Sequence, residues 1–160
     1  MSTRIHLITA SVVLFLGAVL CVFVFYWMEP HFEEVNAAYV KEHTGKPGFL
    51  LVDVRDEDVF NGKSPFDGAP GGHIAGAVNF PGSRLELRNA EELLKKSGLR
   101  KDVTLILYCN AGLLSSSFAE ALVKEFEFDA SMIKSYKEGT LGWVRDPANK
   151  LLPEDHELGK

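Results

Sequence analysis

The sequence has few cysteines and no excess of positive charge. Cys21 and Cys109 are the only two cysteines among its 160 residues, so no framework of disulfides supports the fold. Arg4 and Glu29 are the only charged residues before Pro30, and the chain beyond it holds 21 acidic against 16 basic residues. An acidic domain is repelled by phosphate, which argues against nucleic acid as a partner. The histidines lack metal-ligand spacing, and we expect neither a metal nor a cofactor.

One long segment near the start carries no charge. Residues 7–28 contain no Asp, Glu, Lys or Arg, and as a helix they would reach about 33 Å, enough to cross a hydrocarbon core of about 30 Å. Tyr26 and Trp27 near its end match the aromatic residues found at membrane interfaces. The pattern predicts a transmembrane anchor over residues 1–29, a domain over residues 30–153 and a flexible tail over residues 154–160.

A cleaved signal peptide is the alternative reading of this segment. Val35-Asn36-Ala37 loosely resembles a cleavage site, but it lies well beyond the apolar segment, which is itself longer than the roughly 7 to 15 apolar residues of a signal peptide. We therefore favour an uncleaved anchor. Arg4 precedes the segment and no Lys or Arg follows it before Lys41, so the domain should face away from the cytoplasm. In a bacterium that compartment is the periplasm.

Beyond Pro30, apolar runs alternate with amphipathic segments. Four runs predict buried strands, over residues 49–54, 77–80, 103–108 and 131–136. Three segments predict helices, over residues 32–43, 91–96 and 118–126. Strands that alternate with helices form a parallel sheet covered on both faces, so we predict an α/β fold. From Ala148 onward we expect loose order.

Cys109 lies where a predicted strand runs into a predicted helix. The first N–H groups of a helix have no partner within it and attract anions, and a thiolate is an anion. Cysteines at such positions can have pKa values of roughly 3.5 to 7.5 instead of about 8.5, which makes them nucleophiles at neutral pH. The alternative is a buried cysteine that only fills space. A lone thiol in an oxidising compartment favours the reactive interpretation.

Four motifs occur in the order typical of one family. They are Asp53-Val54-Arg55, then Gly72-His73-Ile74 with residues 76–81, then Tyr108-Cys109 with Gly112 and Ser115, and finally Gly139 with Gly142-Trp143. In these motifs the chain resembles rhodanese-like domains, over roughly residues 33–153. The resemblance implies a parallel sheet of about five strands flanked by helices. It also implies a catalytic cysteine at the head of a loop that enters a helix.

The resemblance assigns the chemistry to Cys109. It implies that this thiolate takes sulfane sulfur from thiosulfate, a persulfide or a polysulfide, carries it as a persulfide, and passes it to cyanide or a thiol, including a protein thiol. The donor and the carried sulfur would lie against the loop that follows, whose backbone amides would hold negative charge. The implied substrate-binding residues are Asn110, Ala111, Gly112, Leu113, Leu114 and Ser115.

Two features depart from the family pattern. Active members often carry Arg or another polar residue at the position of Leu114, so an anionic donor loses a charged partner here, and Leu113 extends an apolar rim. This rim favours a low-molecular-weight persulfide, a polysulfide or a protein thiol over thiosulfate. An insertion over residues 61–71 either shapes access for the acceptor, with Lys63 as a replacement cation, or is ordinary surface variation, which we favour.

Other motif residues are expected to support the fold. Asp53 and Arg55, at the end of a predicted strand, should hold the adjoining loops by hydrogen bonds. His73 and Trp143 should be structural. The three serines at positions 115–117 should cap the helix that follows, although one hydroxyl could instead reach the sulfur.

Two other functions remain open on the sequence. One is a rhodanese-like module without catalysis, which recognises a partner or relays sulfur within a membrane complex. Leu114 and the acidic composition are compatible with it, whereas retention of Cys109 argues against it. The other is a phosphatase or an arsenate reductase. Those reactions need an arginine to hold a tetrahedral oxyanion, and none lies between Cys109 and Phe118.

Overall fold

The computed structural model describes residues 15–20, 31–85 and 90–153. The chain divides into two compact units, residues 1–31 and residues 32–160. In the first unit residues 15–20 are helical, and the rest of the predicted anchor lies outside the described residues. Within the described ranges no helix is both long enough and apolar enough to cross a membrane. The predicted tail over residues 154–160 also lies outside them.

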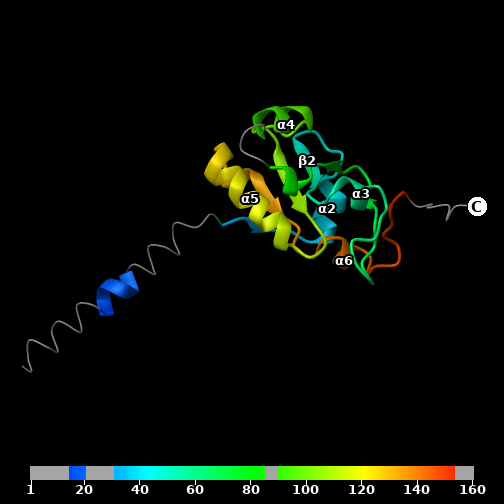
Figure 1. Cartoon of the computed structure of the whole chain (residues 1–160), viewed down its shortest axis with the longest axis horizontal. Helices are drawn as coiled ribbons and strands as arrows, with labels where there is room; N and C mark the ends of the chain where they lie inside the picture. The colour runs from blue at the N-terminus through cyan, green and yellow to red at the C-terminus, as the bar shows by residue number, and fades with distance from the viewer. Residues whose placement is uncertain (1–14, 21–30, 86–89, 154–160) are drawn as a thin grey trace, which may run out of the picture. The chain divides into compact units, whose positions relative to one another are not determined.

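The second unit is built on a parallel sheet, as the sequence predicts (Figure 1). Its five strands lie in the order β1-β6-β5-β2-β4, and each neighbouring pair is parallel. A short antiparallel pair, β3 with β7, lies apart from this sheet. The strands are β1 (Glu33–Glu34), β2 (Phe49–Asp53), β3 (His73–Ile74), β4 (Val78–Asn79), β5 (Thr104–Tyr108), β6 (Ile133–Ser135) and β7 (Leu151–Leu152).

Helices cover both faces of the sheet, which confirms the predicted α/β architecture. They are α2 (Ala37–His43), α3 (Glu57–Phe60), α4 (Ala90–Lys96), α5 (Leu113–Phe126) and α6 (Gly139–Trp143), with 3-10 turns η1 (Gly82–Arg84) and η2 (Ala130–Met132). One hydrophobic core joins the sheet to α4 and α5, and a second joins it to α2 and α6. The fold therefore buries the central strands on both sides.

The central strand β5 shows why the sequence folds in this way. Its side chains alternate between the two cores, with Leu105 and Leu107 on the α5 side and Ile106 and Tyr108 on the α2 side. All four are fully buried, which explains the uninterrupted apolar run in the sequence. The alternation continues beyond the strand and places Cys109 in the core next to α5.

Two predicted helix boundaries are wrong. The helix predicted over residues 32–43 begins only at Ala37, because the side chain of Asn36 caps it by accepting from the Tyr39 N–H at 3.0 Å. The residues before it form β1, which pairs with β6. The helix predicted to begin at residue 118 begins five residues earlier, at Leu113, because Gly112 adopts the left-handed conformation from which the helix can start.

The expected loose order from Ala148 is also wrong for the described part of that segment. Leu151 and Leu152 form β7 and pair antiparallel with Ile74 and His73. The indole N–H of Trp143 donates to the Lys150 carbonyl at 3.0 Å. A two-residue strand is too short to show the alternation of apolar and polar residues that identifies a strand, so the pairing of β7 with β3 could not be predicted from the sequence.

Candidate active site

Cys109 directly follows β5, at the edge of the sheet where the parallel strands end. Its side chain is 4% exposed. The backbone around it is fixed by the start of α6, since the Thr140 N–H donates to the Cys109 carbonyl at 3.0 Å and the Leu141 N–H donates to the Asn110 carbonyl at 3.1 Å. The thiol is therefore held on a turn that two elements brace, β5 and α6.

Two hydrogen-bond donors reach the sulfur. The Gly112 N–H lies 3.1 Å from Cys109 Sγ, and the Ser115 hydroxyl lies 3.7 Å from it. The same hydroxyl lies 3.1 Å from the Gly112 carbonyl, and having one proton it donates to one acceptor at a time. Both donors favour a negatively charged sulfur over a neutral one. The arrangement suits a thiolate or a persulfide anion at the start of α5.

The three serines do not cap the helix as predicted. The capping position belongs to Gly112, whose carbonyl accepts from the Ser116 N–H at 3.0 Å. Ser115 lies inside the first turn and is fully buried beside the sulfur, so the alternative role for one hydroxyl describes it better. The Ser117 hydroxyl instead lies 3.4 Å from the Leu113 carbonyl on the exposed side.

The predicted substrate-binding residues separate into three groups. Gly112 and Ser115 contact the sulfur. Ala111, Leu113 and Leu114 are exposed, and Leu113 at 83% forms the most exposed part of the rim. Asn110 forms the third group. Its side chain neither contacts the sulfur nor joins the exposed rim, because it turns inward and accepts hydrogen bonds from Arg55 and Thr140.

Two glycines allow this geometry. Gly112 has φ 87°, and a Cβ there would lie 2.8 Å from the carbonyl oxygen of Lys137. At Gly139, with φ 58°, a Cβ would overlap the carbonyl oxygens of Cys109 and Asn110. A side chain at either position would push apart the loop and the segment that braces it.

A buried ion pair lies under the loop. Arg55 is 3% exposed, and its guanidinium contacts the fully buried Asp53 carboxylate with N–O distances of 2.6 to 3.2 Å. The pair holds adjoining loops, as predicted, since Arg55 also donates to the Gly72 carbonyl. The sequence did not reveal that Arg55 Nη1 lies 3.1 Å from Asn110 Oδ1. Adjacent parallel strands end at the same edge, and only the order of β2 beside β5 could have indicated this contact.

The family model of the rhodanese-like domain matches residues 36–146. The chain belongs to the rhodanese-like domain family. No curated protein matches it. Solved structures of EanB share the fold: the wild-type structure has a TM-score of 0.66 at 18% identity, covering 77% of this chain and 28% of that one. An EanB variant with ergothioneine linked to a persulfide cysteine has a TM-score of 0.66 at 20% identity, covering 76% and 28%. This chain thus spans about 28% of EanB.

Tyr108 is the last residue of β5 and lies buried directly before Cys109. Its hydroxyl accepts from the Ile74 N–H at 3.1 Å and lies within the influence of the Asp53 carboxylate. Burial, and then the neighbouring Asp53 charge, raise the pKa of Tyr108 well above its ordinary value. The phenol therefore stays neutral and serves as a fixed acceptor for the Ile74 N–H.

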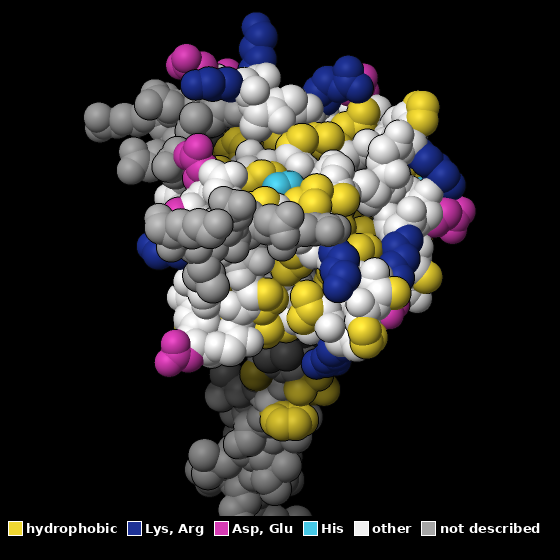
Figure 2. Space-filling view, turned by 90° about the vertical axis from the view of Figure 1, so that its right-hand side faces the viewer, with side chains coloured by type: hydrophobic (Ala, Val, Ile, Leu, Met, Phe, Trp, Pro, Cys, Tyr) yellow, Lys and Arg dark blue, Asp and Glu magenta, His cyan; other side chains and the backbone are white. Residues whose placement is uncertain are grey.

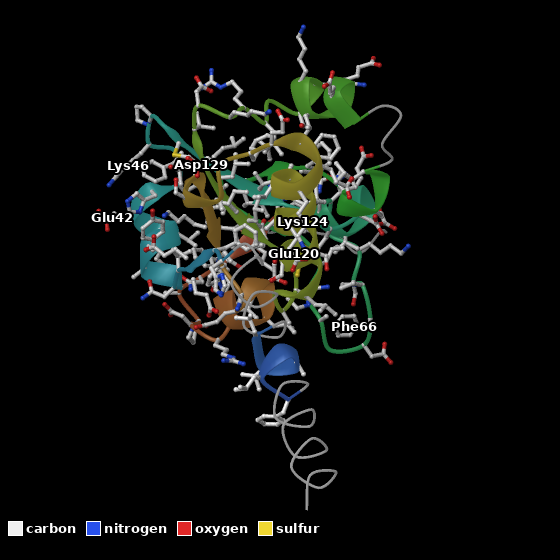
Figure 3. The ribbon with its side chains drawn as sticks, turned by 90° about the vertical axis from the view of Figure 1, so that its left-hand side faces the viewer. Glu42, Lys46, Phe66, Glu120, Lys124 and Asp129 are labelled. Carbon is white, nitrogen blue, oxygen red and sulfur yellow. The ribbon has the colours of Figure 1, made fainter. Side chains whose placement is uncertain are left out.

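His73 has the structural role that the sequence predicts. Its ring stacks on Phe60 with centroids 3.7 Å apart, and its Nδ1 lies 2.9 Å from the Phe60 carbonyl. In the insertion over residues 61–71, the Lys63 ammonium pairs with Asp58 at 2.7 Å. Phe66, labelled in Figure 3, lies on the outer side of this insertion and is 55% exposed.

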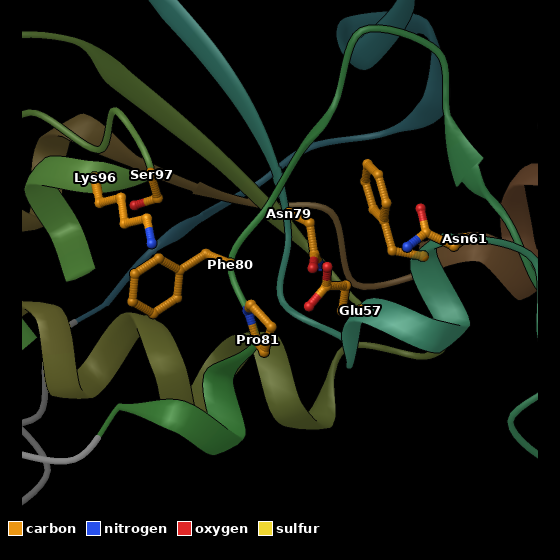
Figure 4. A pocket seen from close by; sticks show the side chains of 8 residues that line it. Glu57, Asn61, Asn79, Phe80, Pro81, Lys96 and Ser97 are labelled. Atoms are coloured by element: carbon orange, nitrogen blue, oxygen red, sulfur yellow. The ribbon is translucent and has the colours of Figure 1, made fainter.

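One well-formed hollow lies away from the thiol. A cavity of about 400 Å³ lies between α3, β4 and the end of α4, with Lys96 and Phe80 on one side and Glu57 and Asn61 on the other (Figure 4). Cys109 does not line it. On the face in Figure 2, Lys and Arg side chains stand apart, separated by hydrophobic and polar ones. No cluster of three metal-ligating side chains occurs within the described ranges.

Proposed function

We propose that this rhodanese-like domain is a sulfurtransferase that carries sulfane sulfur on Cys109. The Cys109 thiolate attacks the outer sulfur of the donor, so that a new S–S bond forms as the donor's own S–S bond breaks. Thiosulfate leaves as sulfite, a persulfide leaves as a thiolate, and a polysulfide leaves as a chain shorter by one sulfur atom. A thiol or cyanide then attacks the outer sulfur of the persulfide and releases the Cys109 thiolate. The observation that carries this proposal is the pair of donors aimed at Sγ, from Gly112 at 3.1 Å and Ser115 at 3.7 Å.

The loop favours a donor without a large anionic head. Leu113 and Leu114 are exposed where a charged partner for thiosulfate would lie. Two cations that could replace it are already engaged, Arg55 by Asp53 and Lys63 by Asp58. We therefore infer that a low-molecular-weight persulfide, a polysulfide or a protein persulfide loads Cys109 faster than thiosulfate does.

The test is the intact mass of the protein after incubation with each donor. Full-length chain in detergent, carrying Cys21→Ser so that Cys109 is its single thiol, is treated with thiosulfate or with a polysulfide. A gain of about 32 Da that dithiothreitol reverses and Cys109→Ser abolishes supports the proposal. A folded protein with a titratable thiol that gains no mass from either donor contradicts it.

A second candidate is a module that binds a partner without catalysis. The observations in its favour are the low exposure of Cys109, at 4%, and the exposed apolar pair Leu113 and Leu114. Cys109→Ser separates the two functions, because a binding module keeps its partner and its cellular role after this change.

We also propose that residues 1–29 anchor the domain in a membrane, with the domain facing away from the cytoplasm. The support is the uncharged run over residues 7–28 and the position of Arg4 before it. Extraction of membranes with alkaline carbonate tests this. Retention of the full chain, together with release of a chain that begins at Pro30, supports the anchor, and release of both contradicts it.

A further inference from the structure

A buried network joins the end of β2 to the loop that carries the thiol. Asn110, the residue after Cys109, accepts two hydrogen bonds on Oδ1, from Arg55 Nη1 at 3.1 Å and from the Thr140 hydroxyl at 3.3 Å. Arg55 Nη1 also lies 3.4 Å from that hydroxyl. The three side chains therefore meet at one point beneath the loop, next to Asp53, which holds the other edge of the guanidinium.

We propose that Arg55 is a positioning residue for Cys109 and acts through the side chain of Asn110. The proposal rests on the proposed function only in taking the Cys109 thiolate as the reactive group. The network fixes the direction in which the chain leaves Cys109, and so keeps the Gly112 N–H aimed at Sγ, 3.1 Å away. Neither Arg55 nor Asn110 contacts the sulfur, so their effect on reactivity must pass through the loop.

Two simpler roles for Arg55 make different predictions. If Arg55 only neutralises Asp53, then loss of the Asn110 side chain leaves that pair intact and changes nothing at the sulfur. If its charge acts on the thiolate directly, the effect likewise survives without Asn110. Among the described residues, Lys137 and Glu138 are also charged and close to the loop. The Lys137 backbone lies against Gly112 and its ammonium pairs with Glu34, and Glu138 precedes Gly139. Only a role through the carboxamide makes Asn110 essential.

The test is the rate at which iodoacetamide alkylates Cys109 as a function of pH. Full-length chain in detergent with Cys21→Ser is compared with the same chain carrying Asn110→Ala. We expect alkylation about five- to tenfold slower at neutral pH, a profile moved to higher pH, and the same maximal rate at alkaline pH. Ser117→Ala is the matched control, because this exposed side chain bonds only within its own helix turn, and its profile should not move.

A double-mutant cycle decides the route. Arg55→Lys keeps the charge but loses the guanidinium geometry, and it should slow alkylation in the parent chain and add nothing when Asn110→Ala is already present. If Arg55→Lys does not fold, Thr140→Val replaces it in the cycle, because this change removes the other donor to the carboxamide.

The proposal is overturned if Asn110→Ala leaves the pH profile of alkylation unchanged. It is also overturned if the variant with both substitutions is slowed by the product of the two single effects. Persulfide loading is measured separately on the same proteins. A parent chain that fails to load while its alkylation profile still depends on Asn110 contradicts the proposed function and leaves the positioning role standing.

Discussion

At the scale of single residues, the reactivity of Cys109 depends on the few groups that donate hydrogen bonds to its sulfur. In the described part of the chain these are one backbone amide and one hydroxyl, from Gly112 and Ser115. A well-formed hydrogen bond to a charged group contributes about 1.5 to 3 kcal/mol. The Ser115 hydroxyl, which is 3.7 Å from the sulfur and also reaches the Gly112 carbonyl, should contribute less. The amide cannot be removed by substitution, whereas the hydroxyl can.

Ser115→Ala should slow persulfide loading about three- to tenfold, because the sulfur loses one donor while the fold is kept. The measurement is the rate of mass gain with a polysulfide, with Ser117→Ala as the control from the same turn. Equal rates for the two variants would mean that the Ser115 hydroxyl bonds only the Gly112 carbonyl.

The rim residue Leu114 governs the choice of donor in our proposal. Leu114→Arg would supply a guanidinium at an exposed position, where it can hold the oxyanion of thiosulfate. We expect the rate of loading by thiosulfate to rise at least about fivefold relative to loading by a polysulfide. Leu113→Arg is the neighbouring control, and equal gains from both would point to net charge instead of a defined contact.

At the scale of elements, the site is made where the start of α5 and the start of α6 meet the end of β5. Gly139→Ala tests this junction, because its methyl group would overlap the carbonyl oxygens of Cys109 and Asn110. Gly98→Ala is matched to it, since Gly98 also has positive φ but a Cβ there meets nothing within 4 Å. We expect Gly139→Ala to lower the free energy of unfolding by about 1 to 3 kcal/mol more than Gly98→Ala does.

Persulfide loading gives the second readout for this pair. Gly139→Ala should lose most of its loading because the loop moves, while Gly98→Ala should load like the parent chain. Denaturant unfolding followed by fluorescence provides the stability of each variant. If Gly139→Ala and Gly98→Ala lose equal amounts of unfolding free energy, then backbone strain at positive φ, and not the close approach to the carbonyl oxygens, causes the destabilisation.

Periodicity predicted most of the elements but not the details of their ends. The strands around residues 49–54 and 103–108 are buried on both faces and could be predicted from their apolar runs. The start of α5 could not, because it depends on the left-handed backbone of Gly112, which no hydrophobic pattern encodes. Short elements such as α3 and β7 have too few residues to show a period.

The site was predictable to a similar extent. The sequence pointed to Cys109 and to the amides of its loop, since both follow from a strand that enters a helix. The contact between Arg55 and Asn110 joins residues 55 positions apart and depends on β2 lying beside β5. Strand order is a property of the whole sheet, so neither residue's neighbours in the sequence reveal it.

At the scale of the whole domain, stability should fall at alkaline pH. Burial, and then the nearby Glu138, raise the pKa of Tyr136 to about 12 from an ordinary value of 10.0. The unfolded chain loses this proton near pH 10 while the folded chain keeps it, so the contribution is complete below pH 10 and is lost as the pH rises to about 12. We expect a loss of roughly 1 to 3 kcal/mol over this window.

Tyr136→Phe should remove the part of this alkaline loss that Tyr136 contributes, while Tyr108, whose pKa is also raised, continues to contribute its own part. The Tyr136 hydroxyl is buried without a hydrogen-bond partner among the described residues, so the change should cost little or be stabilising at pH 7. Tyr108→Phe is the contrast, because it removes the buried bond to the Ile74 N–H and should destabilise by about 1 to 2 kcal/mol at neutral pH. Urea unfolding at several pH values measures both. A Tyr136→Phe protein as sensitive to alkali as the parent would contradict the assignment.

The close approach at Gly139 also bears on how other sequences of this family are sorted. Retention of the cysteine is a weak marker of a competent site, because a thiol can persist as a packing residue. Gly139 is a stricter marker, since any side chain there collides with the carbonyl oxygen of Cys109 itself. A relative that keeps the cysteine but replaces this glycine cannot form the same turn. It should be classed as a rhodanese-like module without catalysis until its thiol is shown to carry sulfur.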